Sequence, residues 1–340
     1  MCKLENIRFI YEEIVSKKTK NKRKVLAFDN YYMQNIFYIK YLLSHECYTP
    51  NKYNIFLIKE PKVRLIMSQT IQDKVINHLV SNYILRPVIE PILIDTNVAT
   101  RKKKGTRLGV TRLKKYINEI KLETECFYIL KFDISKYFYS IDHEVLKSML
   151  QRKIKDKKAL NIIYKIIDST NEEYINEVVK SLKSKNKELD IPHYQKGKGL
   201  PIGNMTSQIL ALLYLNELDH FIKERLHIKY YIRYMDDGIL IHQDKWYLKY
   251  CLRKIQKRIE EKQKLKLNPK TKLFSIKESI EYIGYRYLLK KKRLLIKIKR
   301  KTKKKMKKSS KVENYKGYVK YAKTKNLVYE KDKRYLFYLE

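Results

Sequence analysis

The sequence predicts an α+β fold in which an antiparallel sheet is backed by helices. Phe127–Asp133 is a short apolar run that indicates a buried strand, and Tyr230–Ile241 indicates the two strands of a hairpin. Apolar residues at helical spacing occur between these segments and again at Leu248–Ile259. With 340 residues, 44% of them hydrophobic, the chain is long enough to bury a sizeable core.

The formal net charge of the chain is +41. Such an excess attracts polyanions, so nucleic acid is the first partner to consider and a membrane surface the second. An AT-rich genome would raise lysine over arginine, but it does not explain why Asp and Glu together number only 36. The 30 tyrosines would suit base stacking on a basic surface, although a core position is the simpler interpretation for any one of them.

The four cysteines are far apart and none lies in a C-x-x-C pair, so the sequence predicts neither a zinc site nor a disulfide framework: Cys2, Cys47, Cys126 and Cys251. The first residues contain no apolar signal core. The longest apolar run, Ile209–Leu215, is too short to span a bilayer. We therefore expect a soluble cytoplasmic protein with no membrane partner.

Amphipathic segments at Ile7–Val15 and Tyr31–Leu43 open the chain, and no internal repeat follows. A basic extended stretch, Ile58–Ile66, precedes a helical pattern that runs from Ile71 to Tyr83. Asn97–Thr106 is a basic loop before the first strand of the predicted sheet.

Asp142 is placed to cap a helix at His143–Leu150. Residues 151–198 are rich in lysine, and Gly197–Gly203 is a glycine-bearing turn before a strongly apolar helix. Lys290–Lys311 is the sharpest change in composition. Because apolar and aromatic residues return after it, we expect a basic, partly helical C-terminal lobe and not a free tail.

Acidic residues interrupt both strand patterns. Asp133 ends the first strand, and Asp236 and Asp237 lie side by side within the hairpin. A carboxylate beside a core is costly unless it is paired or binds a metal, although Asp237-Gly238 alone would also indicate an ordinary hairpin turn. Two Mg²⁺ ions about 3.5–4 Å apart activate a 3′-hydroxyl and stabilise a leaving pyrophosphate. Acids at two neighbouring strand ends would suit them, since Mg²⁺ favours carboxylates together with substrate phosphates.

Several blocks of this sequence resemble those of reverse transcriptases. Tyr234–Asp237 is similar to the family's Tyr-x-Asp-Asp signature, and Asp133–Phe138 is similar to its first catalytic block. Four further segments resemble, in turn, the basic fingers pair, the turn-and-helix block, the block with the general-acid lysine and the primer-grip hairpin: Lys62–Arg64, Gly199–Gln208, Leu265–Lys272 and Tyr282–Tyr285. All occur in family order, and the resemblance covers roughly residues 50–325.

The resemblance implies a right-hand polymerase that copies template RNA into cDNA from dNTP substrates on a primer strand. Fingers would come from residues 1–125 and the palm from 126–286, with 151–198 partly returning to the fingers. Residues 287–340 would form a basic helical thumb that grips the template–primer duplex by charge and shape. The cofactor would be two Mg²⁺ ions, for which Mn²⁺ can substitute.

The resemblance also implies a role for individual residues. Asp133, Asp236 and Asp237 would be the catalytic metal ligands, with Asp237 the less direct of the three. Lys270 would protonate the leaving pyrophosphate, although Lys272 is a close competitor that sequence does not separate from it. The remaining positions would bind the nucleotide or template: Lys62 and Arg64 at the triphosphate, Phe138 as a steric gate against a 2′-hydroxyl, and Ile202, Gly203 and Gln208 in the turn-and-helix block.

Ile202 departs from the pattern, since retroviral, retron and group II intron enzymes usually have Gln there. An apolar residue followed by Gly-x-x-x-Ser-Gln resembles the reverse transcriptases of diversity-generating retroelements, which copy RNA with errors at adenines and work with small basic accessory proteins. Loss of a polar contact at this position would loosen selection of the incoming base. Reverse transcriptases of phage-defence and abortive-infection systems share much of the pattern and stay an alternative, as does a non-catalytic RNA-binding scaffold.

Overall fold

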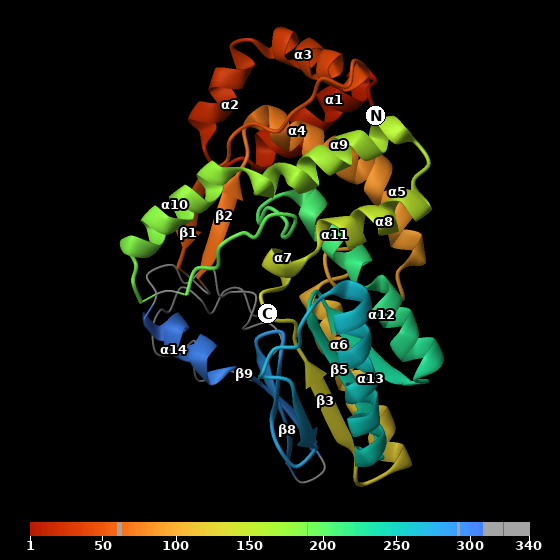
Figure 1. Ribbon diagram of the computed structural model, residues 1–340. Coiled ribbons are helices and arrows are strands. Elements are labelled where there is room, and N and C mark those ends of the chain that lie inside the picture. Colours follow the sequence, from red (N-terminus) through yellow and green to blue (C-terminus); the bar gives the residue numbers. More distant parts are fainter. Residues whose placement is uncertain (60–62, 189, 291–292, 309–321, 323–340) are drawn as a thin grey trace. The chain divides into compact units, whose positions relative to one another are not determined.

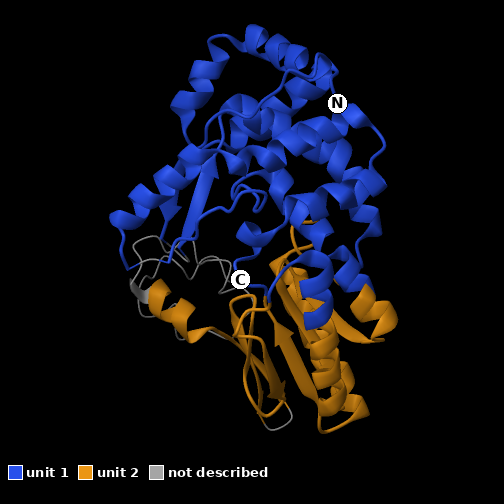
Figure 2. Cartoon of the chain, viewed as in Figure 1, with its two compact units in different colours: residues 1–94, 134–220, 256–266 blue, residues 95–133, 221–255, 267–340 orange. Residues whose placement is uncertain are grey.

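The computed structural model describes residues 1–59, 63–188, 190–290, 293–308 and 322 (Figure 1). It combines helices with antiparallel sheets, as the sequence predicts. The chain divides into two compact units, and the segments that form them alternate along the sequence (Figure 2). Unit 1 is Met1–Ile94, Ile134–His220 and Gln256–Lys266, and unit 2 is Asp95–Asp133, Phe221–Ile255 and Leu267–Glu340. The predicted division into fingers, palm and thumb stays a prediction, since these units follow different boundaries.

Unit 1 is mainly helical and has one antiparallel hairpin, made of β1 (Asn54–Ile58) and β2 (Arg64–Ser68). Its helices, with η marking short π or 3-10 turns, are α1 (Leu4–Phe9), η1 (Ile10–Ser16), α2 (Lys22–Asp29), α3 (Tyr32–Ser44), α4 (Ile71–Val80), η2 (Ser81–Leu85), α5 (Arg86–Ile89), η3 (Glu90–Ile92), α7 (Tyr137–Ser140), α8 (His143–Lys153), α9 (Lys157–Asp168), η4 (Ser169–Asn171), α10 (Glu173–Ser184), α11 (Met205–Tyr214) and α12 (Asn216–His220).

Side-chain caps set where several of these helices begin. The carboxylate of Asp142 accepts a hydrogen bond of 3.1 Å from the Val145 amide, so the predicted cap of α8 is confirmed. Thr70 and Asp156 cap α4 and α9 in the same way. Each cap satisfies amide groups that have no partner within the helix, and for α8 the sequence pattern locates the start of the helix.

Unit 2 holds a four-stranded antiparallel sheet in the order β4-β5-β3-β6 and a three-stranded antiparallel sheet in the order β7-β8-β9. Its elements are α6 (Thr106–Glu123), β3 (Tyr128–Phe132), η5 (Phe221–Arg225), β4 (Tyr230–Tyr234), β5 (Asp237–His242), β6 (Lys272–Ser275), β7 (Ile280–Tyr282), β8 (Tyr285–Lys290), β9 (Arg293–Ile298) and α14 (Arg300–Lys308). Helix α13 (Lys245–Gln263) starts in unit 2 and ends in unit 1.

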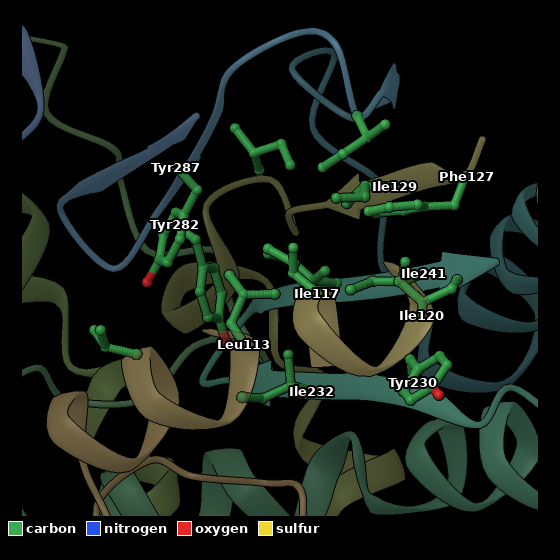
Figure 3. Packing of buried hydrophobic residues seen from close by; sticks show 14 of the residues in the cluster. Leu113, Ile117, Ile120, Phe127, Ile129, Tyr230, Ile232, Ile241, Tyr282 and Tyr287 are labelled. Atoms are coloured by element: carbon green, nitrogen blue, oxygen red, sulfur yellow. The ribbon is translucent and has the colours of Figure 1, made fainter. Parts of the chain in front are cut away.

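The core of unit 2 joins α6 to the four-stranded sheet (Figure 3). Leu113, Ile117 and Ile120 share one face of α6 at helical spacing and are fully or almost fully buried. They belong to one cluster with Ile129 of β3 and Ile232 of β4. This packing holds the ends of β3 and β5, where the acids lie, on a rigid support.

The segment after residue 286 begins with strand, whereas we expected a helical thumb from residue 287. β8 and β9 pair along their whole length, with Leu288 opposite Leu295 and Lys290 opposite Arg293. The apolar residues that interrupt the lysine run are therefore strand residues, and helix follows only in α14. Apart from residue 322, the chain beyond 308 lies outside the described residues. Within the described residues, no helix has both the length and the apolar character needed to cross a membrane.

Candidate active site

Asp133 and Asp237 are neighbours because of the strand register. β3 ends at Phe132, which pairs with Gly238 of β5, so the next residue, Asp133, continues the register opposite Asp237. On the other side, Tyr234 pairs with Asp237 across β4 and β5. The sheet therefore brings the three predicted acids to one edge, although about one hundred residues of sequence separate Asp133 from the other two.

Met235 and Asp236 form the two-residue turn of the hairpin, since the flanking residues are the last pair of its ladder. Met235 has a φ of 56°, a left-handed conformation that is unusual for a residue with a side chain. The Arg233 side chain is fully buried and donates a hydrogen bond of 2.5 Å to the Met235 carbonyl. Arg233 thus stabilises the turn through this hydrogen bond. Sequence patterns did not single it out, although a basic residue inside an apolar strand was the available signal.

The turn lies two residues earlier than the Asp237-Gly238 dipeptide would indicate, and Gly238 is a strand residue instead. A Cβ atom at Gly238 would lie 2.2 Å from the Phe132 ring, its partner in β3. The ring fills the space that a side chain would need. The glycine is therefore required by packing between β3 and β5 and not by turn geometry.

Asp236 lies in an environment that opposes its ionisation. Burial, followed by the nearby carboxylates of Asp133 and Asp237, raises the pKa of Asp236 to about 7, and a hydrogen bond with Asp133 contributes in the same direction. A divalent cation at this edge would offset both the cost of burying the ionised carboxylate and the repulsion between the carboxylates. The carboxylate pair Asp133–Asp236 therefore fits an ion such as Mg²⁺, which needs only one or two protein carboxylates when substrate phosphates supply other ligands.

Asp237 is held differently from the other two acids. Its carboxylate lies 3.2 Å from the Lys131 ammonium group, which also donates to the Glu281 carbonyl at 3.1 Å. Among the residues that the structure describes, no three His, Cys, Asp or Glu side chains converge to hold an ion unaided. A direct metal contact of Asp237 stays a prediction, and Lys131 is a neighbour that the sequence did not indicate.

Lys270 lies on a turn that is bonded to the backbone of Asp133. The Asn268 amide donates to the Asp133 carbonyl at 2.8 Å, and the Thr271 amide closes the turn onto Asn268. Lys270 is exposed on this turn, whereas Lys272 begins β6 and has Glu278 at 3.8 Å. The structure thus gives the two candidate lysines different surroundings, and the general-acid role stays a prediction for Lys270.

The other predicted nucleotide-binding residues that the structure describes belong to unit 1. Arg64 is exposed at the start of β2, and the half-buried Phe138 lies in α7, where its carbonyl accepts from the Leu200 amide at 2.7 Å. The Met67 amide of β2 donates to the Ile202 carbonyl at 2.8 Å. The turn-and-helix block is therefore tied both to the β1–β2 hairpin and to the segment after Asp133. Lys62 lies outside the described residues.

Gly203 and Gln208 line a cleft of about 180 Å³ within unit 1. Its other polar lining includes Lys18, Lys74 and His78. Burial, followed by the positive charges of Lys18, Arg86 and Lys74, lowers the pKa of His78 to about 4. The lining thus carries cationic groups that would favour an anionic occupant.

Replacing Gly203 by alanine is expected to destabilise the protein by about 1–3 kcal/mol more than Gly105→Ala. Both glycines have a strongly positive φ, 131° and 140°, but a Cβ at Gly203 would lie 2.8 Å from the Met67 carbonyl oxygen, whereas nothing lies within 4 Å of one at Gly105. The matched control thus separates steric contact from backbone strain. Denaturant unfolding of the two variants measures the difference, and equal losses would contradict the contact.

The chain is similar in sequence to known proteins. The family model described as reverse transcriptase (RNA-dependent DNA polymerase) matches residues 52–287. The group II intron-encoded protein LtrA of Lactococcus lactis subsp. cremoris is 26% identical over 161 residues, which cover 47% of this chain and 23% of that protein. The chain thus spans less than a quarter of the length of this curated relative.

Solved structures share the fold at low sequence identity. Apo telomerase from Candida tropicalis, truncated from its C-terminal domain, superposes with a TM-score of 0.51 and 13% identity, covering 78% of this chain and 60% of that one. Telomerase from Candida albicans, in complex with a fragment of telomeric RNA, gives a TM-score of 0.50 and 13% identity, covering 74% and 46%. At this identity the likeness concerns the fold alone.

Proposed function

Because the chain belongs to the reverse transcriptase (RNA-dependent DNA polymerase) family, we propose that it extends a DNA strand along an RNA template. The observation that carries this proposal is the carboxylate pair at the edge of the four-stranded sheet. Asp133 and Asp236 come together there, and burial, followed by repulsion from Asp133, raises the pKa of Asp236. Two carboxylates held this close together are suited to bind divalent cations together with the phosphates of a nucleotide.

The chemistry proposed for this site is nucleotidyl transfer. Bound divalent ions would supply charge stabilisation for an attacking 3′-hydroxyl and a leaving pyrophosphate. Asp133 and Asp236 would hold them, while Asp237 would orient the strand edge through its ion pair with Lys131. Lys270 would give a proton to the pyrophosphate, and Arg64 would neutralise the triphosphate through a two-pronged contact.

Primer extension by the purified chain tests this function. A labelled DNA primer annealed to a defined RNA should be extended in the presence of dNTPs and Mg²⁺, and a chelator should stop the reaction. The same primer on a DNA template of equal sequence serves as comparison. Tight RNA binding without dNTP incorporation, across several primers and with either Mg²⁺ or Mn²⁺, would contradict the proposal and favour a non-catalytic RNA-binding role.

The finer proposal is error-prone copying of the kind found in diversity-generating retroelements. It rests on Ile202, a half-buried residue whose side chain has no hydrogen-bonding group. An apolar side chain at this position of the block would offer no polar check on the geometry of the nascent base pair. The same proposal includes a small basic accessory protein as a partner.

Ile202→Gln is expected to lower misincorporation opposite template adenine by roughly three- to tenfold, the effect of about one net hydrogen bond. Sequencing of cDNA made from one defined RNA measures the error spectrum. Ile202→Leu is the matched control, since it keeps an apolar side chain of similar size and should leave the spectrum unchanged. An unaltered error rate in the Gln variant would contradict the proposed role of Ile202 and favour a reverse transcriptase without diversification, as in phage defence.

A further inference from the structure

The first half of helix α13 exposes two aromatic rings one helical turn apart. Trp246, the only tryptophan of the chain, is 72% exposed, and Tyr250 is 42% exposed. The opposite face of the helix is buried through Leu248, Cys251 and Ile255. The rings therefore do not serve the core, although burial of aromatic rings is what usually stabilises a fold.

Basic side chains surround these rings. The Lys249 ammonium group lies 4.1 Å from the centre of the Trp246 ring, and that of Lys254 lies 5.4 Å from the centre of the Tyr250 ring. Arg253 is exposed on the same stretch, and no acidic residue occurs in residues 245–259. Within the described part of the chain, no carboxylate lies within ion-pair distance of Lys249, Arg253 or Lys254. Their positive charge is therefore available to a partner.

This surface is separate from the carboxylate edge. Strand β5 starts at Asp237 and ends at His242, and α13 follows after Asp244, whose carboxylate caps the helix by accepting from the Trp246 amide at 2.7 Å. At about 3.3 Å per residue, the strand carries the chain roughly 17 Å from the acids before the helix begins. The exposed rings thus lie beyond the far end of β5.

We propose that this Trp246 face, made of Trp246, Lys249, Tyr250, Arg253 and Lys254, binds single-stranded nucleic acid outside the polymerase centre. Exposed aromatic rings stack on unpaired bases, and interspersed cations bind the phosphates between them. The four residues from Trp246 to Tyr250 separate the rings by a rise of about 6 Å along the helix, a spacing that an extended strand can match. A duplex would offer no free base faces to the rings, since its bases are already stacked on each other.

Because Trp246 is the only tryptophan, its fluorescence reports on this face alone. Titration with a dodecamer of thymidylate or of uridylate, with a chelator and without dNTPs, is expected to quench that fluorescence, and a blunt duplex of equal length is not. The two dodecamers show whether the face prefers DNA or RNA. Anisotropy of end-labelled oligonucleotides measures total binding in parallel. Binding by anisotropy with unchanged tryptophan fluorescence would overturn the proposal, since the strand would then lie elsewhere.

Variants separate stacking from general charge. Trp246→Ala with Tyr250→Ala should weaken binding of the dodecamer by roughly tenfold or more, whereas Trp246→Phe with Tyr250→Phe should retain most of it. Changing Lys249, Arg253 and Lys254 to Gln should reduce the slope of log affinity against log salt by about 2. The matched control changes the exposed Lys153, Lys155 and Lys157 to Gln. An equal loss of binding in that control would mean non-specific attraction by the whole basic chain and would contradict binding at the Trp246 face.

Extension of a primer whose template overhangs it by only one or two nucleotides distinguishes this proposal from the polymerase function. The ring variants should extend such a template at the normal rate, because no single strand reaches the Trp246 face. Quenching of Trp246 by a protein or by anionic vesicles, with no response to either dodecamer, would assign the face to another partner and exclude nucleic acid.

Discussion

Replacement of Asp236 by asparagine is expected to lower the rate of RNA-templated primer extension by on the order of 10³-fold or more. Asparagine has nearly the same shape as aspartate, so the turn between β4 and β5 should persist, but it removes one of the two carboxylates that approach each other there. A neutral amide is a weak ligand for a hard divalent cation. Steady-state extension with labelled primer measures the loss, and higher Mg²⁺ concentrations should restore little of it.

Asp244→Asn is the matched control for this variant. It makes the same chemical change within unit 2, and asparagine caps a helix about as well as aspartate does. Extension by this variant should stay close to that of the wild-type chain. If Asp236→Asn extended primers at a comparable rate, the assignment of the carboxylate pair to catalysis would be wrong, whatever the family resemblance.

The Asp236→Asn variant is expected to be more stable than the wild-type chain at pH 8 when no metal is present. The folded pKa of Asp236 is about 7, and the ordinary value is 3.8, so between these values the folded state binds more protons than the unfolded state. Stability of the wild type therefore falls as the pH rises from about 4 to 7. Asparagine does not titrate, and its advantage at pH 8 should be about 2–4 kcal/mol, allowing for solvent screening.

Denaturant unfolding at a series of pH values, with a chelator present, measures this difference. The curves of the two proteins should converge near pH 4 and separate as the pH rises. Saturating Mg²⁺ at pH 8 should then stabilise the wild type and leave the variant nearly unchanged, because binding to the folded state alone raises stability. Parallel curves at all pH values would show that Asp133 and Asp237 do not strain Asp236 in the folded protein.

Local patterns in the sequence located several of the elements, including the strands that carry the predicted acids, but not the β8–β9 hairpin near residue 287. The hairpin around Met235, the strand that ends at Asp133 and the cap of α8 at Asp142 all depend on periodicity or on hydrogen bonds between residues close in sequence. Such signals act over a few residues, and a single chain displays them fully. The match of the family model over residues 52–287 agrees with the family that those blocks indicate.

Only the tertiary structure decided which side chains meet around the acids. The turn falls on Met235 and Asp236 because Phe132 occupies the space beside Gly238, a contact set by the register between β3 and β5. The pairing of Lys131 with Asp237 follows from the same register, and the support of the Met235 carbonyl by Arg233 follows from the burial of that guanidinium group. These contacts depend on pairing between distant segments and on the burial of whole side chains, so no local pattern reveals them.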